Sequence, residues 1–264
     1  MKHVIKSKRH GSSRRAKRKL ESEDIILSQG SIQNAVKILG LKRVKVQPKP
    51  KLSEAQMQKR IEFAEKKRAR NYWRRVLFTD ETLLFLEPPS THVYISSGDS
   101  IPQIPRSKQS PKIMVWGGIS WYGKTELILV AQGESVDSKR YQKVLSRAWP
   151  SIRAQFPGNI RWILQQDGAK CHTSRSTMQW LEDKGAEVLS DWPANSPDLN
   201  CLENLWEMFK EQVYRRNFKT LRGLYRVARE EWNQIEHKKI RNLIRSMPER
   251  LTQVIERNGE TTDY

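Results

Sequence analysis

The chain has 264 residues, of which 37% are hydrophobic and 30% are charged, and its net charge is +20. That length allows one large core and one or two domains, while nine tryptophans, seven tyrosines and six phenylalanines argue against a chain disordered throughout. Two cysteines are too few for a disulfide framework, and no apolar run approaches the roughly 20 residues needed to span a bilayer.

The positive charge is concentrated near the N-terminus. Residues 1–75 hold 23 lysines and arginines against six acidic residues, so 17 of the 20 net positive charges lie there. Residues 1–30 combine dense charge with few apolar side chains, which predicts a basic, disordered arm whose natural partner is a polyanion. The run KSKRHGSSRRAKRK within it also fits a nuclear-localisation signal, so a nuclear location is expected. A solvated tail with no specific partner is the alternative.

Two helices are predicted after the arm. The first, SIQNAVKILG, has Ser31 as its N-cap and apolar residues at i, i+4 and i+7. A linker containing prolines follows, and a second helix begins near Ser53.

The pattern then changes to that of a sheet covered by helices. Strands are predicted at 76–86, 92–96, 112–120, 124–130, 160–166 and 186–189. Helices are predicted at 137–156, 174–184, 197–216, 221–235 and 239–256. Successive strands followed by alternating helices and strands predict an α/β protein with a mixed sheet flanked by helices, in the element order of the ribonuclease-H-like fold.

Asp80 lies inside the first predicted strand, on the face that carries Val76, Phe78 and Leu84. Burying a carboxylate on the more apolar face of a strand costs on the order of several kcal/mol of folding free energy, unless a cation or a basic side chain lies near it. The alternative is a residue near the strand end that reaches solvent.

Two further acids hold comparable positions. Asp167 follows the predicted strand 160–166, where functional groups collect in α/β sheets, although it could equally be a turn aspartate before Gly168. Glu203 lies at the edge of the buried stripe of helix 197–216, whose predicted N-cap is Ser196. A solvated helix glutamate is the alternative there.

Together the three acids form the oxygen-donor set that hard divalent cations require. Two such ions about 4 Å apart can activate a nucleophile and stabilise the leaving oxygen of a phosphodiester. Neutralising any one acid is expected to abolish this chemistry and to preserve or raise stability without metal, because like charges are removed.

Four segments occur in this order along the chain: VLFTDET, KIMVWGGIS, ILQQDGAKCHTS and WPANSPDLNCLENLWEMFK. They resemble the catalytic blocks of the mariner-like (Tc/mariner superfamily) DDE transposases and the strand between the first two blocks. The resemblance spans roughly residues 31–216, and the 35 residues between Asp167 and Glu203 are a family-like gap.

The resemblance implies a catalytic domain that binds Mg²⁺, or Mn²⁺ in its place, through Asp80, Asp167 and Glu203. It also implies cut-and-paste transposition by a homodimer: hydrolysis of double-stranded DNA at the terminal inverted repeats, then attack of the freed 3′-hydroxyl on target DNA. His172 is similar to a family histidine close to the site. Because imidazole is not a preferred Mg²⁺ ligand, His172 is expected to orient a ligand or contact DNA.

The N-terminal region departs from the family pattern of two helix-turn-helix units, because residues 31–45 resemble only the end of the second unit. Lys37, Lys42, Arg43 and Lys45 in this remnant are the candidate DNA contacts, through phosphates rather than base edges. The predicted organisation is a basic arm at 1–30, the remnant and a linker helix at 31–70, the catalytic domain at 71–235 and a helical tail at 236–264.

Two other functions stay open. The chain could be a catalytically silent, truncated transposon-derived protein that only binds DNA, since a recently shortened copy would retain its acids. It could also be a cellular ribonuclease-H-like nuclease of another family, against which the block SPDLNCLENLW argues.

Overall fold

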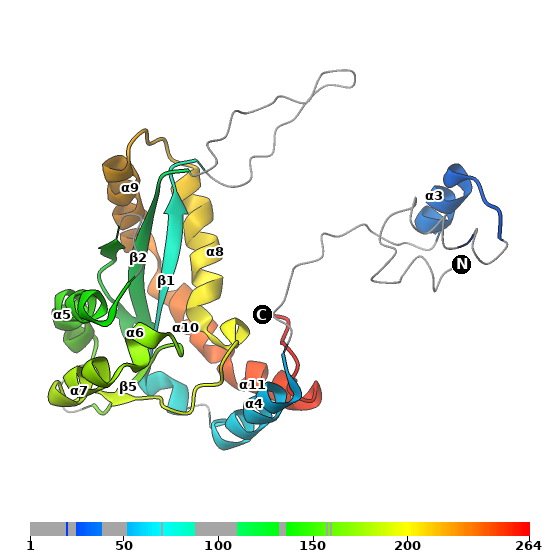
Figure 1. The fold of residues 1–264 in the computed structure, drawn as a ribbon. Coiled ribbons are helices and arrows are strands. Elements are labelled where there is room, and N and C mark those ends of the chain that lie inside the picture. The colour runs from blue at the N-terminus through cyan, green and yellow to red at the C-terminus, as the bar shows by residue number, and fades with distance from the viewer. Residues whose placement is uncertain are drawn as a thin grey trace. The chain divides into compact units, whose positions relative to one another are not determined.

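The computed structural model describes residues 20, 25–38, 52–69, 71–87, 110–131, 136–156, 158 and 160–264. The chain divides into two compact units, Met1–Pro50 and Lys51–Tyr264 (Figure 1). In the first unit, helix α3 spans Gln29–Ile38 and contains Lys37. The predicted strand at 92–96, the candidate contacts Lys42, Arg43 and Lys45, and most of the predicted basic arm lie outside the described residues.

Within the described ranges, the second unit is built on a six-stranded sheet. Its strands are β1 (Val76–Phe85), β2 (Lys112–Ser120), β3 (Gly123–Lys124), β4 (Ile128–Ala131), β5 (Ile163–Gln165) and β6 (Glu187–Val188). The order is β3-β2-β1-β5-β6, with β4 also paired to β2. Strand β2 runs antiparallel to β1, whereas β5 and β6 extend the sheet in parallel. The predicted mixed sheet is therefore confirmed, although the strand predicted at 124–130 is split into β3 and β4.

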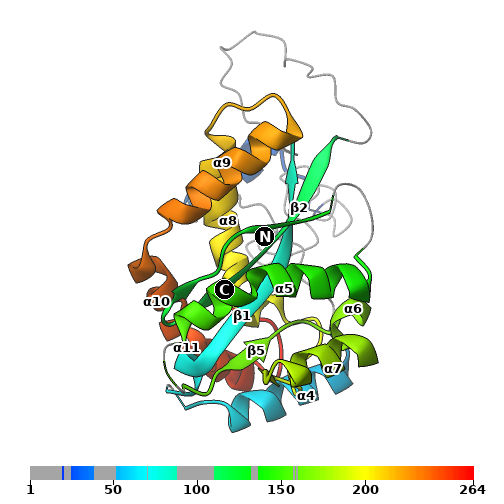
Figure 2. The same ribbon diagram turned by 90° about the vertical axis from the view of Figure 1, so that its left-hand side faces the viewer.

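Helices cover both faces of this sheet (Figures 1 and 2). One face is covered by α5 (Ser138–Gln155) and α7 (Arg175–Asp183), and the other by α8 (Cys201–Tyr214), α9 (Leu221–Gln234) and α10 (His237–Arg245). The core under α5 includes Leu77, Trp116, Tyr141, Leu145 and Leu164. The core under α8 to α10 includes Val76, Phe78, Trp206, Trp232 and Ile240. Neighbouring residues of β1 thus enter opposite cores, as the pleat of a strand requires.

A glycine in β2 lets α8 and α9 approach the sheet closely. Gly117 pairs with Asp80 across β1 and β2. A Cβ at this position would lie 3.0 Å from the rings of Trp206 and Trp232, which is too close for an unshifted core. Gly117 therefore sets how near α8, the helix that carries Glu203, lies to β1.

The start of α8 differs from the prediction. Pro197–Leu199 form the 3-10 helix η2, and α8 begins after Asn200, whose Oδ1 accepts a hydrogen bond from Leu202 N at 3.0 Å. In the described structure Ser196 makes no side-chain capping bond, so its predicted role as N-cap is wrong. Its hydroxyl instead accepts a hydrogen bond from Arg60 Nη1 at 2.6 Å.

The C-terminal segment predicted as one helix is two. Helix α10 ends at Arg245 and α11 spans Met247–Glu256, with Pro248 in its first turn. Helix α11 packs on α4 (Glu54–Lys66), which begins after Ser53 as predicted, in a capping box with Gln56. Helices α4, α10 and α11 thus lie in the same compact unit as the sheet. The functional boundaries drawn at residues 71 and 235 stay a prediction.

Every helix in the described part of the chain is too short or too polar to cross a membrane.

Candidate active site

The register of the sheet brings Asp80 and Asp167 to one level. Strands β1 and β5 are parallel, and Phe78 lies opposite Gln165. Asp80 follows Phe78 by two residues and Asp167 follows Gln165 by two residues. Because adjacent strands lie about 4.8 Å apart, the two aspartates leave neighbouring strands side by side.

Glu203 reaches the same region from the first turn of α8. Asn200 fixes that turn, because its Oδ1 caps the helix while its Nδ2 donates to Thr79 O at 3.4 Å. Thr79 directly precedes Asp80 in β1. The start of α8 is therefore tied to the strand beside Asp80.

The carboxyl groups of Asp80 and Glu203 crowd each other. Burial raises the pKa of Asp80 well above its usual range, and the charges of Glu203, Glu81 and Asp167 raise it further. Partial burial also raises the pKa of Glu203, against the opposing effects of Lys210 and of a hydrogen bond with Asp80. The residue Glu203 as a whole is exposed, so solvent screens the charge of its carboxyl group. The pKa of Glu203 is therefore raised less than that of a fully buried carboxyl.

Asp167 is held differently from the other two acids. Its Oδ1 accepts hydrogen bonds from His172 Nδ1 at 2.6 Å and from Ala169 N at 3.0 Å. The hydrogen bond from His172 lowers the pKa of Asp167 although partial burial opposes it. With its side chain 62% exposed, Asp167 is an ionised carboxylate at the edge of the site.

His172 bridges two carboxylates from the short helix α6 (Lys170–Thr173), which was not predicted. Its ring is buried, lies 4.1 Å from the ring of Tyr141, and places Nε2 3.2 Å from Glu81 Oε1. Burial lowers the pKa of His172, but the hydrogen bonds to Asp167 and Glu81 outweigh this and raise it to about 10. Both ring nitrogens lie against carboxylate oxygens, which fits a role in orienting Asp167.

The donor chemistry of the three acids fits a hard divalent cation. Within the described residues, no three His, Cys, Asp or Glu side chains surround a single point as metal ligands do. The crowding that raises the pKa of Asp80 is nevertheless the condition that a bound cation relieves, and all the donors are carboxylate oxygens. The residues present thus suit Mg²⁺ or Mn²⁺, with Asp167 engaged by His172 rather than by the other two acids.

Three contributors to this region were missed by the sequence reasoning. Glu81 follows Asp80 in β1 and lies on the opposite face of the strand, and that face meets His172. Lys210 follows Glu203 by seven residues, so helical periodicity alone places both on one face of α8. Burial lowers the pKa of Lys210, while the acids near it act in the opposite direction. Asn200 lies in the block SPDLNCLENLW, and its strong preference for N-cap positions was the available signal.

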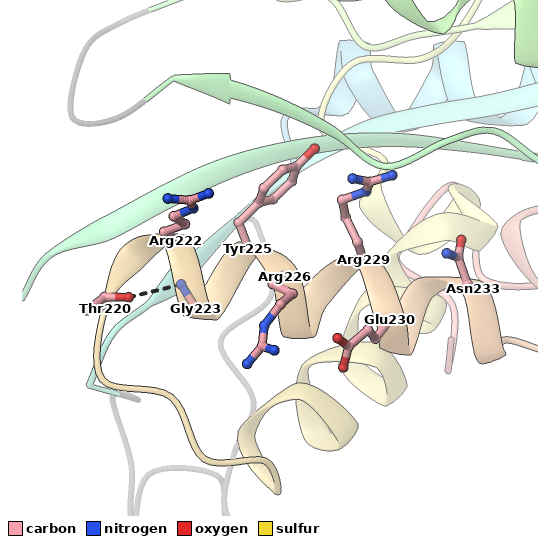
Figure 3. Close-up of a pocket in the computed structure, with 8 residues that line it drawn as sticks. All are labelled: Thr220, Arg222, Gly223, Tyr225, Arg226, Arg229, Glu230 and Asn233. Atoms are coloured by element: carbon pink, nitrogen blue, oxygen red, sulfur yellow. Dashed lines mark hydrogen bonds between the residues drawn. The ribbon is translucent and has the colours of Figure 1, made fainter.

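A groove runs along α9, and none of the three acids lines it (Figure 3). It has a volume of about 620 Å³ and is lined by Thr220, Arg222, Gly223, Tyr225, Arg226, Arg229, Glu230 and Asn233. Arg222, Tyr225 and Arg229 point to one side of the helix and Arg226 and Glu230 to another. Glu230 is paired with Arg216 at 2.9 Å. The groove is therefore a basic helix surface and not the site of the three acids.

The chain is similar in sequence to known proteins. Residues 75–225 match the family described as DDE superfamily endonuclease. The Tc3 transposase of Caenorhabditis elegans is 32% identical over 243 residues, which cover 90% of this chain and 72% of that protein. The Tc1 transposase of the same organism is 26% identical over 253 residues, which cover 90% and 88%.

Solved structures share the fold. A pre-cleavage Mos1 transpososome aligns with a TM-score of 0.83 at 21% identity, covering 99% of this chain and 78% of that chain. The catalytic domain of Mos1 transposase with raltegravir and Mg aligns with a TM-score of 0.65 at 22% identity, covering 81% and 100%. The second unit thus has the ribonuclease-H-like fold of that domain.

Proposed function

The chain belongs to the DDE superfamily endonucleases, among the Tc1/mariner transposases, and from this premise we propose how its residues act on DNA. The protein is a DNA transposase, an enzyme that cuts DNA and transfers strands. We assign its chemistry to Asp80, Asp167 and Glu203, acting on terminal inverted repeats and then on target DNA. The observation that supports this most is geometric: Asp80 and Asp167 lie at one level of the parallel strands β1 and β5, and Asn200 ties the start of α8, which carries Glu203, to Thr79 O.

The proposed cofactor is Mg²⁺, with Mn²⁺ as a substitute. Mos1 paired-end complexes have been solved with Mn and with Mg. When bound, the metal would supply Lewis acidity at the phosphodiester, both at the attacking and at the leaving oxygen. Asp80 from β1 and Glu203 from α8 would hold it from one side, and Asp167 from the end of β5 would complete the oxygen set.

The surrounding residues keep the acids ready for this role. His172 holds Asp167 ionised, and Glu81 fixes the other nitrogen of the His172 ring. Lys210 lies close enough to Glu203 and Asp80 for each to influence its pKa, so it offsets part of their negative charge without forming an ion pair that would occupy them. These groups orient and balance the carboxylates rather than touch the scissile phosphate.

We also propose that the enzyme works as a homodimer in the nucleus. Mos1 transposase has been solved in paired-end complexes with transposon-end DNA, which supports a dimer that holds two ends. The basic run in residues 1–30 supports nuclear import, and Lys37, Lys42, Arg43 and Lys45 are the proposed phosphate contacts of the first unit.

A cleavage assay tests the assignment. The full chain is incubated with Mn²⁺ and a linear duplex that carries the element's ends, beside Asp80→Asn, Asp167→Ala and Glu203→Gln. We expect metal-dependent cleavage that all three variants lose. Glu207→Gln, an exposed glutamate one turn along α8, is the matched control and should cleave like the parent chain.

Two outcomes contradict the proposal. A triad variant that still cleaves removes that residue from the site. Binding of the duplex by the parent chain with no cleavage under any metal would favour the alternative, a catalytically silent DNA-binding protein.

A further inference from the structure

Three arginines converge on one tryptophan at the edge of the sheet. The guanidinium carbons of Arg74, Arg241 and Arg245 lie 4.6, 5.3 and 5.2 Å from the ring centroid of Trp121. They come from η1 (Tyr72–Arg75) and from α10, while Trp121 directly follows β2. We call Arg74, Arg241 and Arg245 the arginine cluster.

The cluster has no acidic partner in the described part of the chain. Among those residues, no carboxylate lies within ion-pair distance of Arg74, Arg241 or Arg245. By contrast, exposed Arg215 and Arg216 are each paired with glutamates. Three like charges around one ring repel one another, and cation–π attraction offsets only part of that cost.

Most N–H donors of the cluster are free to bind a ligand. Trp121 O accepts hydrogen bonds from His237 Nε2 at 2.8 Å and from Arg241 Nε at 3.2 Å, which fixes the backbone beneath the cluster. Arg245 Nη1 donates to Asn242 Oδ1 at 3.2 Å. The remaining guanidinium donors have no described protein acceptor, and the planar fork of arginine matches the oxygens of a phosphate.

The cluster lies away from the three acids. Arg74 precedes β1, and Asp80 comes four positions after Val76 in that strand, which corresponds to a distance of about 13 Å. At about 3.4 Å per nucleotide along a strand, that distance corresponds to roughly four base pairs. A phosphate bound by the cluster is therefore outside the reacting centre but within reach of the same duplex.

The α9 groove is the weaker candidate for such a contact. Its arginines share the helix with Glu230, and Figure 3 shows Arg226 and Glu230 on the side of α9 away from Arg222 and Arg229. That mixed charge is typical of a solvated helix face. The arginine cluster, by contrast, brings three arginines from two elements onto one aromatic ring, and no acidic side chain of the described residues pairs with them.

We propose that the arginine cluster on Trp121 binds the phosphate backbone of duplex DNA at a position outside the scissile phosphodiester. The proposal rests on the enzyme acting on DNA, but it does not depend on the metal or on the identity of the catalytic acids. The contact carries no sequence information, so it serves equally for DNA flanking the element and for target DNA.

Binding without metal tests the proposal. The full chain carrying Arg74→Gln, Arg241→Gln and Arg245→Gln together is titrated, in EDTA, with a duplex that lacks element ends, across a range of salt concentrations. The slope of log K against log salt should become shallower by about two to three, and affinity near 0.15 M salt should fall by about tenfold or more. Lys143→Gln, Arg147→Gln and Arg153→Gln, exposed residues of α5 on the other face of the sheet, are the charge-matched control.

Equal slopes for the two triple variants would overturn the proposal, because the effect would then be one of net charge alone. A second measurement on the unaltered chain guards against misfolding of the variant: arginine modification by phenylglyoxal, mapped by mass spectrometry. DNA should protect Arg74, Arg241 and Arg245 but not Arg147 or Arg153, and an unprotected cluster would contradict the proposal. Loss of cleavage activity with these results intact would count against the proposed catalytic function only.

Discussion

Asp80 and Asp198 are both aspartates largely removed from water, but their surroundings act on them in opposite directions. Burial raises the pKa of Asp198, yet paired hydrogen bonds from Arg60 Nη1 and Nη2, at 3.0 and 2.7 Å, lower it below its usual range. Burial also raises the pKa of Asp80, and there the charges of Glu203, Glu81 and Asp167 raise it further. A buried charge that is fully partnered is part of the scaffold, whereas a buried charge among like charges is suited to receive a ligand.

The partnered region also joins distant parts of the chain. Arg60 in α4 donates further to Gly259 O at 2.9 Å, and Arg250 in α11 donates to Asp198 O at 2.6 Å and to Asn204 Oδ1 at 2.7 Å. Asp198 therefore connects α4, the start of α8 and the C-terminal segment through hydrogen bonds from Arg60 and Arg250. Nothing comparable satisfies the charge of Asp80 in the described residues.

The largest effect is expected from breaking the partnered region. Arg60→Met should lower the free energy of unfolding by about 3–5 kcal/mol, because Asp198 would be left as a buried charge without its partner. Urea unfolding followed by tryptophan fluorescence measures this. Arg215→Met, which removes an exposed pair with Glu211 on α8, should change stability little, and equal losses for both would show that burial of the Arg60 pair is irrelevant.

A smaller loss should follow from forcing the helices off the sheet above Asp80. Gly117→Ala places a methyl group against Trp206 and Trp232 and should cost about 1–3 kcal/mol. Cleavage should also fall, since α8 carries Glu203. Gly123→Ala is the control, because a Cβ there meets Gln155 at an ordinary contact distance of 3.6 Å, and it should be nearly neutral in both measurements.

Neutralising Asp80 and neutralising Asp167 should change the stability of the metal-free chain in opposite directions. In EDTA, Asp80→Asn should leave the thermal midpoint unchanged or raise it, because a crowded charge is removed. The corresponding gain in the free energy of unfolding should be about 1 kcal/mol or less. Asp167→Asn should lower it, because the short hydrogen bond with His172 loses its charge. This revises the expectation from sequence that all three acids behave alike. Differential scanning calorimetry measures both thermal midpoints, and a higher midpoint for Asp167→Asn would contradict the geometry in which His172 bridges Asp167 and Glu81.

A prediction of a different kind concerns the pH dependence carried by His172. Because its folded pKa of about 10 exceeds the unfolded value near 6.5, its contribution to stability is fully present below pH 6.5 and is lost as the pH rises toward 10. Unfolding of the metal-free chain across this window should therefore show a decline that His172→Gln removes. Parallel curves for the two chains would mean that His172 is not bound as an imidazolium.

Most of the elements, and the positions of the three acids on them, were predictable because their signals are local. Strand β1 is recognisable from the apolar and β-branched residues of VLFTDETLLF, and Asp80, Asp167 and Glu203 each lie at a recognisable place on a strand, after a strand end or in a helix. The contacts between elements were not predictable in this way. Ser196 has the chemistry of an N-cap, but its hydroxyl is bound by Arg60, 136 residues earlier in the chain.

His172 illustrates the same limit. Its place near Asp167 follows from the chain, whereas its second contact, with Glu81 at a separation of 91 residues, depends on how β1 and α6 meet. Fold class and donor types could thus be predicted from local patterns. Charge balance within the site could not, because it depends on tertiary pairing.

The link between Arg60 and Asp198 also has a mechanical meaning. Helix α4 opens the second unit, so any load that the preceding residues place on the chain reaches α4 first. Arg60 passes that load through a buried pair of bonds to Asp198, five residues before Glu203. The first helix of the unit and the segment just before Glu203 are thus anchored to each other through buried, charged hydrogen bonds.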